Sequence, residues 1–188
     1  MEEQKERNGL NFSAINNSGM KIVHTLSKNR EFLQLARLMT DEPLKKSVRM
    51  EELLSDLISE SGKLNGLFIL TPAVETVALE KRVYINFFPY APAGRNGIEL
   101  GKSVQATYYT MNIFIPNDYA LINCSTAWRG LLILDEIGKV IHNAHLTGVG
   151  KVAILDWEQA LVKNNSAFTC ITVTIGVNHA TTSKAFER

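Results

Sequence analysis

A Gly-Lys-Ser triplet at Gly101–Ser103 could bind phosphate, because it resembles the end of a phosphate-binding loop. That loop requires a second glycine five positions earlier, where this chain has Asn96, and Gly97 lies one place too late. The segment that follows, VQATYYTMNIF, has the pattern of a strand, whereas a phosphate site needs a helix N-terminus there. The triplet therefore does not predict a nucleotide site.

Histidines are the next residues that could carry chemistry, and the chain has four: His24, His142, His145 and His179. His142 and His145 are three positions apart and could share one face of a helix. A zinc site needs further ligands at matching spacing, and the HExxH pattern is absent. Histidines in the last turn of a helix are favoured by its dipole, so we expect no metal site.

Two cysteines, Cys124 and Cys170, cannot form a disulfide framework, and no CxxC pair or GxSxG elbow is present. A free cysteine usually packs as a small buried hydrophobe. The sequence thus predicts no catalytic residue and no cofactor. An enzyme site assembled in space around His142, His145 and Asp156 stays open as a less favoured alternative.

Composition narrows the class of protein. The chain has 188 residues, 45% of them hydrophobic, with 20 Lys+Arg against 19 Asp+Glu. This length favours one domain with a sizeable core, and a net charge of +1 argues against a dedicated nucleic-acid binder. No apolar run approaches the ~18–20 residues of a membrane span, and the N-terminus is too polar for a signal peptide. We therefore expect a soluble, intracellular, reduced protein.

Periodicity divides the chain into a flexible N-terminal arm over 1–19, a single domain over 20–178 and a C-terminal tail over 179–188. Residues 20–62 have a helical pattern, which Lys28-Asn29-Arg30 interrupts. The later part of the domain alternates between strand and helix patterns. The simplest packing is an α+β fold, an antiparallel sheet with helices on one face.

Five strands and one long helix are expected. The strands are the short apolar run Leu67–Leu70; Arg82–Phe88, ended by Pro89; Thr107–Ile115; Lys151–Leu155; and Phe168–Val177, with a bulge near Cys170. The long helix runs from about Ser125 to Ala144 and carries His142 and His145 in its last turn, and Asp156–Asn165 is a connection with helical character.

Charge is absent from two long stretches of the expected sheet. Between Lys102 and Arg129 the only charged residue is Asp118, and between Lys163 and Lys184 there is none. These strands are either central strands covered by helices or strands that contact another chain, since interface cores are depleted in charge. The neutral second faces are expected to carry Thr107, Tyr109, Met111, Thr172 and Thr174, and Trp128 and Trp157 to lie in the core or an interface.

A series of ordered segments resembles the tail-terminator, or head-tail connector, ring proteins in the neck of tailed bacteriophages. The segments span residues 20–178 and lie in the family's order. A subgroup that they suggest is the ring proteins of crAss-like phages. The matching segments are IVHTLSKNREFLQLARLMTDEPL, RVYINFFPY, YYTMNIFIPNDYALI, WRGLLILDEIGKVIHNAHLTGVGKV and FTCITVTIGVNH.

The resemblance implies a structural virion protein without catalysis, cofactor or membrane contact. Its subunits would form a six- or twelve-fold ring between capsid portal and tail, and genome DNA would pass through the lumen. Its partners would be its own copies and the neighbouring portal, connector and tail proteins, in the virion neck and, during assembly, in the host cytoplasm. A ring is built from heterologous contacts, which uncharged strands would suit.

Candidate subunit contacts follow from the arm, the loop after the first long strand and the neutral faces. The alternative function is a small-molecule or peptide binding module, which a single apolar pocket would favour. The candidate contact residues are Phe12 and Ile15 in the arm, Pro89, Tyr90, Pro92 and Arg95 in the loop, and Tyr109 and Thr172 on the strands.

Overall fold

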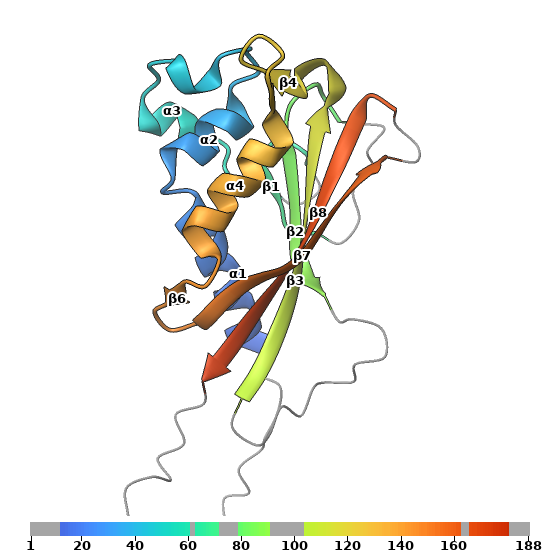
Figure 1. Ribbon diagram of the computed structural model, residues 1–188. Coiled ribbons are helices and arrows are strands. Elements are labelled where there is room, and N and C mark those ends of the chain that lie inside the picture. Colours follow the sequence, from blue (N-terminus) through green and yellow to red (C-terminus); the bar gives the residue numbers. More distant parts are fainter. Residues whose placement is uncertain (1–11, 61–62, 72–78, 91–103, 163–165, 181–188) are drawn as a thin grey trace, which may run out of the picture.

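The computed structural model describes residues 12–60, 63–71, 79–90, 104–162 and 166–180, which form an α+β fold (Figure 1). The helices are α1 (Phe12–Leu26), α2 (Arg30–Arg37), α3 (Met50–Leu54) and α4 (Arg129–Ile141), with short 3-10 turns at Pro43–Lys45 and Asn117–Tyr119. The strands are β1 (Phe68–Ile69), β2 (Tyr84–Tyr90), β3 (Val104–Pro116), β4 (Leu121–Ile122), β5 (Ala127–Trp128), β6 (His145–Leu146), β7 (Gly150–Leu161) and β8 (Phe168–Ala180).

Six of these strands form one curled sheet in the order β1-β2-β3-β8-β7-β6. The two longest strands, β3 and β8, pair antiparallel without interruption from Val104 opposite Ala180 to Pro116 opposite Phe168. The expected antiparallel sheet is confirmed, with one parallel pair, β1 against β2, at its edge. Strands β4 and β5 form a separate small hairpin that leads into α4.

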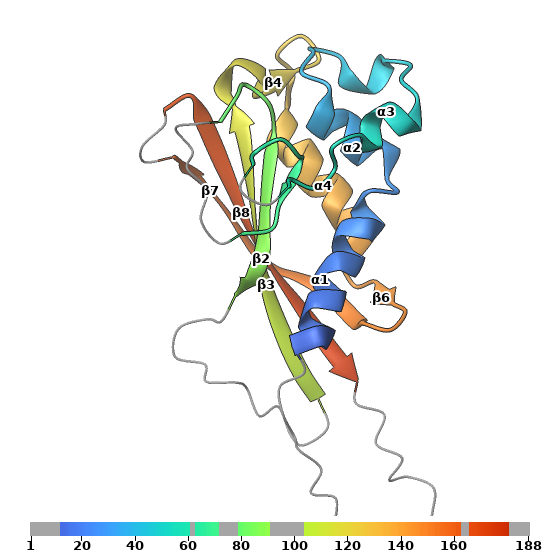
Figure 2. The same cartoon turned by 180° about the vertical axis from the view of Figure 1, so that it is seen from behind.

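The helices cover one face of the sheet, as expected (Figures 1 and 2). Because side chains alternate along a strand, β3 and β8 turn Met111, Ile113, Ile171 and Val173 toward the helices. These residues pack with Ile133 and Ile137 of α4 and with the apolar faces of α1 and α2. This layer is the main core of the molecule.

A second, smaller core lies on the other face of the sheet. It consists of Ile69, Tyr84, Phe114 and Phe168, with Cys170 partly buried beside them. This cluster explains why Phe168 and Cys170 lie out of phase with Ile171. The expected bulge near Cys170 is wrong, because β8 keeps an unbroken register there.

The bulge lies instead on β7, where the register against β8 shifts between Ile154 and Asp156. Leu155 is the extra residue, and β7 then continues to Leu161. The helical character expected over 156–165 is therefore wrong over 156–161, which is strand, and residues 163–165 lie outside the described part of the chain. A bulge reverses the alternation of faces, so the period of two fails at Leu155.

Two further boundaries differ from expectation. Strand β2 does not end before Pro89, which pairs opposite Tyr109. Among the described residues β1 pairs with β2 only as far as Asn86, so the missing N–H of Pro89 breaks no ladder there. Helix α4 ends at Ile141, which places His142 at its C-cap and His145 in β6 rather than in a last helical turn.

Residues 12–19 of the expected N-terminal arm are helical. Helix α1 begins at Phe12, and within it Ser18 and Gly19 are already buried, so residues 12–19 belong to the folded domain. Residues 1–11 and the tail after Ala180 lie outside the described residues. No helix in the described ranges is long and apolar enough to cross a membrane.

Candidate subunit interface

The helix-free face of the sheet carries a row of linked polar side chains. The Thr172 hydroxyl donates to Asn112 Oδ1 at 2.9 Å, and Asn112 Nδ2 donates to Asn86 Oδ1 at 3.3 Å. Asn86 in turn donates from Nδ2 to the carbonyl of Ile69 at 3.2 Å. The row spans three strands and ends at β1, so it pairs polar groups that a half-buried face would otherwise leave unsatisfied.

This face is also uncharged across the central strands. Over the described residues β2, β3 and β8 contribute only neutral side chains to it, and Thr172 and Thr174 lie there as expected. Charge begins on β7, with Asp156 opposite Thr174 and Glu158 opposite Thr172. In the described residues the helix-free face is therefore neutral over β2, β3 and β8, and acidic residues of β7 border it on one side.

Tyr109 lies on the opposite face from the one predicted. It is 1% exposed and its ring stacks on Phe87 with centroids 5.2 Å apart. Its hydroxyl donates to the carbonyl of Ile15 in α1. Burial raises the pKa of Tyr109 to about 12, so the phenol stays protonated and keeps this bond. Thr107 and Met111 share its helix-side phase, and the outward residues of β3 are Tyr108, Thr110 and Asn112.

An apolar groove opens where α1 crosses the ends of β2 and β3. It has a volume of about 210 Å³ and brings together three predicted contact residues, Ile15, Pro89 and Tyr109. For Phe12 and Tyr90 the structure describes the backbone only, and Pro92 and Arg95 lie outside the described residues. The groove lining is Ile15, Asn16, Gly19, Met20, Leu70, Phe87, Phe88, Pro89 and Tyr109.

A second apolar area, which we call the tryptophan surface, consists of Leu121, Trp128, Leu131 and Trp157. Their exposed fractions are 41%, 54%, 41% and 49%. Leu121 pairs across the β4–β5 hairpin with Trp128, and Trp128 and Leu131 line one small crevice with Gln159. Trp157 lies on the same side of β7 as Gln159, since their partners Val173 and Ile171 both face the helices.

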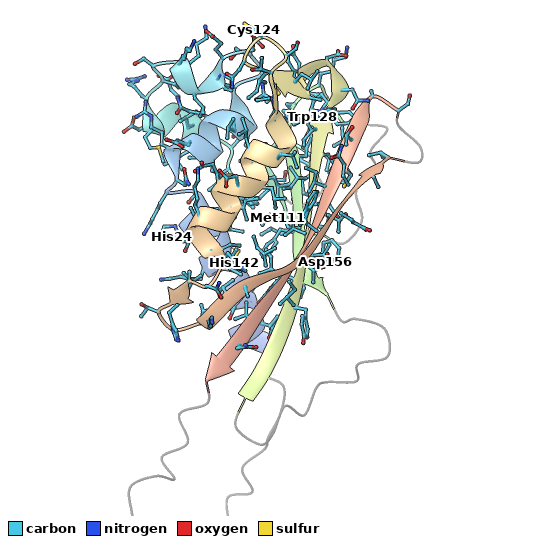
Figure 3. The ribbon with its side chains drawn as sticks, in the orientation of Figure 1. His24, Met111, Cys124, Trp128, His142 and Asp156 are labelled. Atoms are coloured by element: carbon cyan, nitrogen blue, oxygen red, sulfur yellow. The ribbon has the colours of Figure 1, made fainter. Side chains whose placement is uncertain are left out.

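The two apolar areas lie toward opposite ends of the molecule. Trp128 is next to the start of α4, beside the β4–β5 hairpin (Figure 3). The groove is formed by the first turns of α1, which start at the other end (Figures 1 and 2). The described part of the molecule thus presents two unlike apolar surfaces.

Sequence patterns could only partly reveal the tryptophan surface. The two tryptophans were expected in a core or an interface, and both are half exposed. Leu131 falls within the apolar stripe of α4, so periodicity assigns it to the core. Its exposure accompanies a small crevice between the start of α4 and the second half of β7, which Leu131 and Gln159 both line.

The three residues of the possible enzyme site, His142, His145 and Asp156, lie in different settings. His142 accepts the N–H of Ile154 through Nδ1 at 3.1 Å, and Asp156 accepts the N–H of Trp157 at 2.8 Å (Figure 3). His145 is exposed in β6. In the described ranges no three His, Cys, Asp or Glu residues gather as a metal site.

The cysteines also differ in setting. Cys124 is exposed, and its N–H donates to the carboxylate of Asp41. Cys170 is partly buried in the smaller core, and this burial raises the pKa of its thiol. A raised pKa lowers the thiolate fraction, so Cys170 is not an activated nucleophile.

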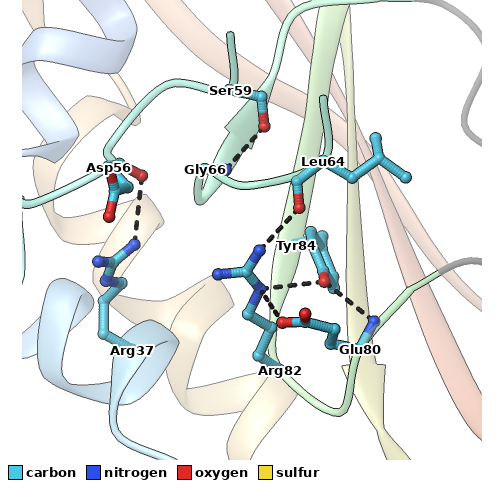
Figure 4. A network of polar contacts seen from close by, with 8 residues as sticks. All are labelled: Arg37, Asp56, Ser59, Leu64, Gly66, Glu80, Arg82 and Tyr84. Carbon is cyan, nitrogen blue, oxygen red and sulfur yellow. Dashed lines mark hydrogen bonds and ion pairs between the residues drawn. The ribbon is translucent and has the colours of Figure 1, made fainter. Parts of the chain in front are cut away.

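Arginine side chains fix the segment that borders β1 (Figure 4). Arg37 of α2 donates to the carbonyls of Ser55 and Asp56, and Arg82 donates to the carbonyl of Leu64 at 2.7 Å. Arg82 also donates to the Tyr84 hydroxyl at 3.0 Å. Burial, followed by the nearby Arg82 charge, lowers the pKa of Arg37. Most of these arginine N–H groups donate to backbone carbonyls, so the network holds the segment beside β1 in place.

Comparison with known proteins gives weak structural likenesses and no named relative. No family model matches the chain, and no curated protein matches it. A solved structure whose name describes no function is 11% identical, with a TM-score of 0.40, and covers 90% of this chain and 96% of its own. A likeness at this level supports no conclusion about function.

Proposed function

We propose that this protein is a structural subunit of a closed ring in the neck of a tailed bacteriophage, between capsid portal and tail. The observation that carries the proposal is the pair of unlike apolar surfaces at opposite ends of one subunit. Monomers rarely expose large contiguous apolar patches. Two different patches suit a heterologous contact, which gives a ring when the rotation closes.

The neutral face supports the same function. A conduit for genome DNA should not hold it, because each phosphate neutralised by Lys or Arg adds salt-dependent affinity. The chain carries a net charge of +1, and the central strands turn no charged side chain to their helix-free face in the described residues. Its other partners would be the portal, connector and tail proteins above and below it. The site of action would be the virion neck, after assembly in the host cytoplasm.

Electron microscopy of the purified full chain tests the proposal. We expect closed rings of six or twelve subunits in negative stain, with a matching mass by light scattering, because both apolar surfaces become buried only in a closed assembly. The same rings should form at the neck of particles that contain the protein. A protein that stays monomeric at millimolar concentration, alone and with neck partners, would contradict the proposal.

The groove favours one second candidate, a small-molecule or peptide binding module. Its volume of about 210 Å³ exceeds the ~150 Å³ apolar cavity that holds a benzene molecule, and Asn16 supplies a polar group at its edge. A monomer that retains a stoichiometric apolar ligand in native mass spectrometry would favour this candidate over the ring.

A further inference from the structure

We propose that the ring contact is a knob in a groove, in which Trp128 of one subunit enters the apolar groove of the next. The inference rests on the proposed function and names its occupant, a second copy of this chain. The knob is Trp128 with its neighbours Leu121 and Leu131, and the groove is the one between α1 and β2 defined above.

The backbone of Trp128 is held in place, although the residue is 54% exposed. Its backbone pairs with Leu121 in the β4–β5 hairpin. The next residue, Arg129, is fully buried and donates to four backbone carbonyls, so the chain on this side cannot move freely. A segment whose backbone is already fixed loses less conformational entropy on binding, which makes Trp128 a good anchor.

The groove has a fixed aromatic floor. The rings of Phe87 and Tyr109 stack at 5.2 Å, and the bond from Tyr109 to the Ile15 carbonyl ties this floor to α1. Gly19 lets the helix approach, because a Cβ there would lie 3.0 Å from the Tyr109 ring. Its volume of about 210 Å³ can admit an indole, which is larger than the benzene held by a ~150 Å³ cavity. Tryptophan in a desolvated pocket is a common binding hot spot.

Charge distinguishes Trp128 from Leu155, the other apolar side chain with 54% exposure. Leu155 lies against Gly176 on the helix-free face, to which Asp156 and Glu158 also point, so burying Leu155 would bring a carboxylate to the contact. Burying an unpaired carboxylate is costly. The neighbours of Trp128 are Ala127 and the already buried Arg129. Trp128 can therefore enter an apolar groove without carrying an exposed charge with it.

A head-to-tail contact of this kind is tested by mixing two half-defective full chains. Trp128→Asp removes the knob and leaves the groove, and Asn16→Arg blocks the groove and leaves the knob. We expect each variant alone to be monomeric in sedimentation velocity, with affinity about 30-fold or more below wild type, as for loss of a hot spot. Mixed together, they should form a 1:1 dimer and no ring, because one good contact remains.

Each half-defective variant has a matched control. Leu155→Asp changes a side chain with the same 54% exposure as Trp128, and Asn17→Arg changes the exposed neighbour of Asn16 outside the groove lining. Both should assemble as wild type. Circular dichroism melting checks the fold of every variant. If Asn16→Arg unfolds, Leu70→Arg blocks the groove from the segment just after β1, and Trp128→Ala serves in place of Trp128→Asp.

The outcomes separate the two proposals. If wild type forms rings and both half-defective variants still do, the knob-in-groove contact is wrong and the ring function stands. Monomeric variants that fail to dimerise when mixed also overturn the contact. If Asn16→Arg assembles normally but is less stable, the groove is occupied by the chain itself and the contact is wrong. If wild type never assembles, the proposed function fails first.

Discussion

At the scale of single residues, Arg129 is the described side chain whose burial requires the most hydrogen-bond partners. It is fully buried at the start of α4 and donates to the carbonyls of Leu35, Leu38, Thr40 and Tyr119 at 2.6–3.0 Å. Three of these carbonyls lie at or just after the C-terminal end of α2, where a helix leaves carbonyls without partners. Burial lowers the pKa of Arg129 to about 10, so it remains charged at neutral pH.

Arg129→Met should therefore destabilise the fold strongly. The substitution keeps the apolar stem but leaves buried carbonyls unsatisfied, each at a cost of about 1–3 kcal/mol. We expect a loss of about 3–5 kcal/mol in the free energy of unfolding, measured by urea titration. Arg30→Met is the control, because Arg30 is exposed and donates to the carbonyl of Val48, and it should cost less than about 1 kcal/mol. Equal losses for the two variants would contradict this role.

At the scale of elements, one carboxylate joins α4 to the break between α1 and α2. Glu136 is 6% exposed and accepts from Asn29 Nδ2 at 2.9 Å and from Lys139 Nζ at 2.5 Å. Asn29 is also the N-cap of α2, since its side chain accepts the N–H of Phe32. Burial alone would raise the pKa of Glu136, but the bonds from Lys139 and Asn29 outweigh it and lower the pKa.

This lowered pKa predicts a pH-dependent effect of Glu136→Gln. A carboxylate whose folded pKa lies below its unfolded value stabilises the fold above about pH 4.3, and the effect is lost as pH falls through the folded pKa. We expect Glu136→Gln to cost about 1–2 kcal/mol at pH 7, as for a hydrogen bond to a charged group. The difference from wild type should shrink below pH 4 in urea titrations. Exposed Glu51→Gln is the control, and a difference that stays constant with pH would contradict the assignment.

Sequence patterns predicted the elements that depend on neighbouring residues in the chain. The break at Lys28-Asn29-Arg30 was predicted because charged and capping residues interrupt the apolar period, and the structure ends α1 at Leu26 and begins α2 at Arg30. The second half of β7 was missed, because Leu155 reverses the alternation that marks a strand. Tyr109 was placed on the wrong face because Thr, Tyr and Met suit either face of a sheet.

The candidate surfaces were less predictable than the elements. Ile15 and Pro89 were named from composition, but only the fold shows that Asn16, Met20 and Leu70 complete a groove with them. Trp128 precedes an apolar helix, so sequence alone cannot say whether it faces the core. The exposure of Trp128 depends on the β4–β5 hairpin that contains it and on the next residue, Arg129, which is the one that is buried.

At the scale of the whole molecule, charge and apolar surface are separated. The ion pairs of the described residues lie on helices, turns and loops, and in all but the pairs of Arg82 and Glu136 both side chains are at least 42% exposed. Exposed pairs of this kind contribute little to stability. The groove and the tryptophan surface instead consist mainly of apolar side chains. An assembly made through these two areas is held together by apolar burial rather than by charge.

This separation predicts that assembly resists salt. Raising sodium chloride from about 0.15 M to about 1 M shortens the Debye length from about 8 Å to about 3 Å, which weakens contacts between exposed charges. Apolar contacts are not screened, so the dissociation constant of the assembly should stay within about threefold or decrease, in sedimentation velocity at both salt concentrations. A contact made through Lys45, Lys46 and Arg49, the exposed basic cluster near α3, would instead weaken tenfold or more. Arg49→Gln is the control for that alternative and should leave assembly unchanged at either salt concentration.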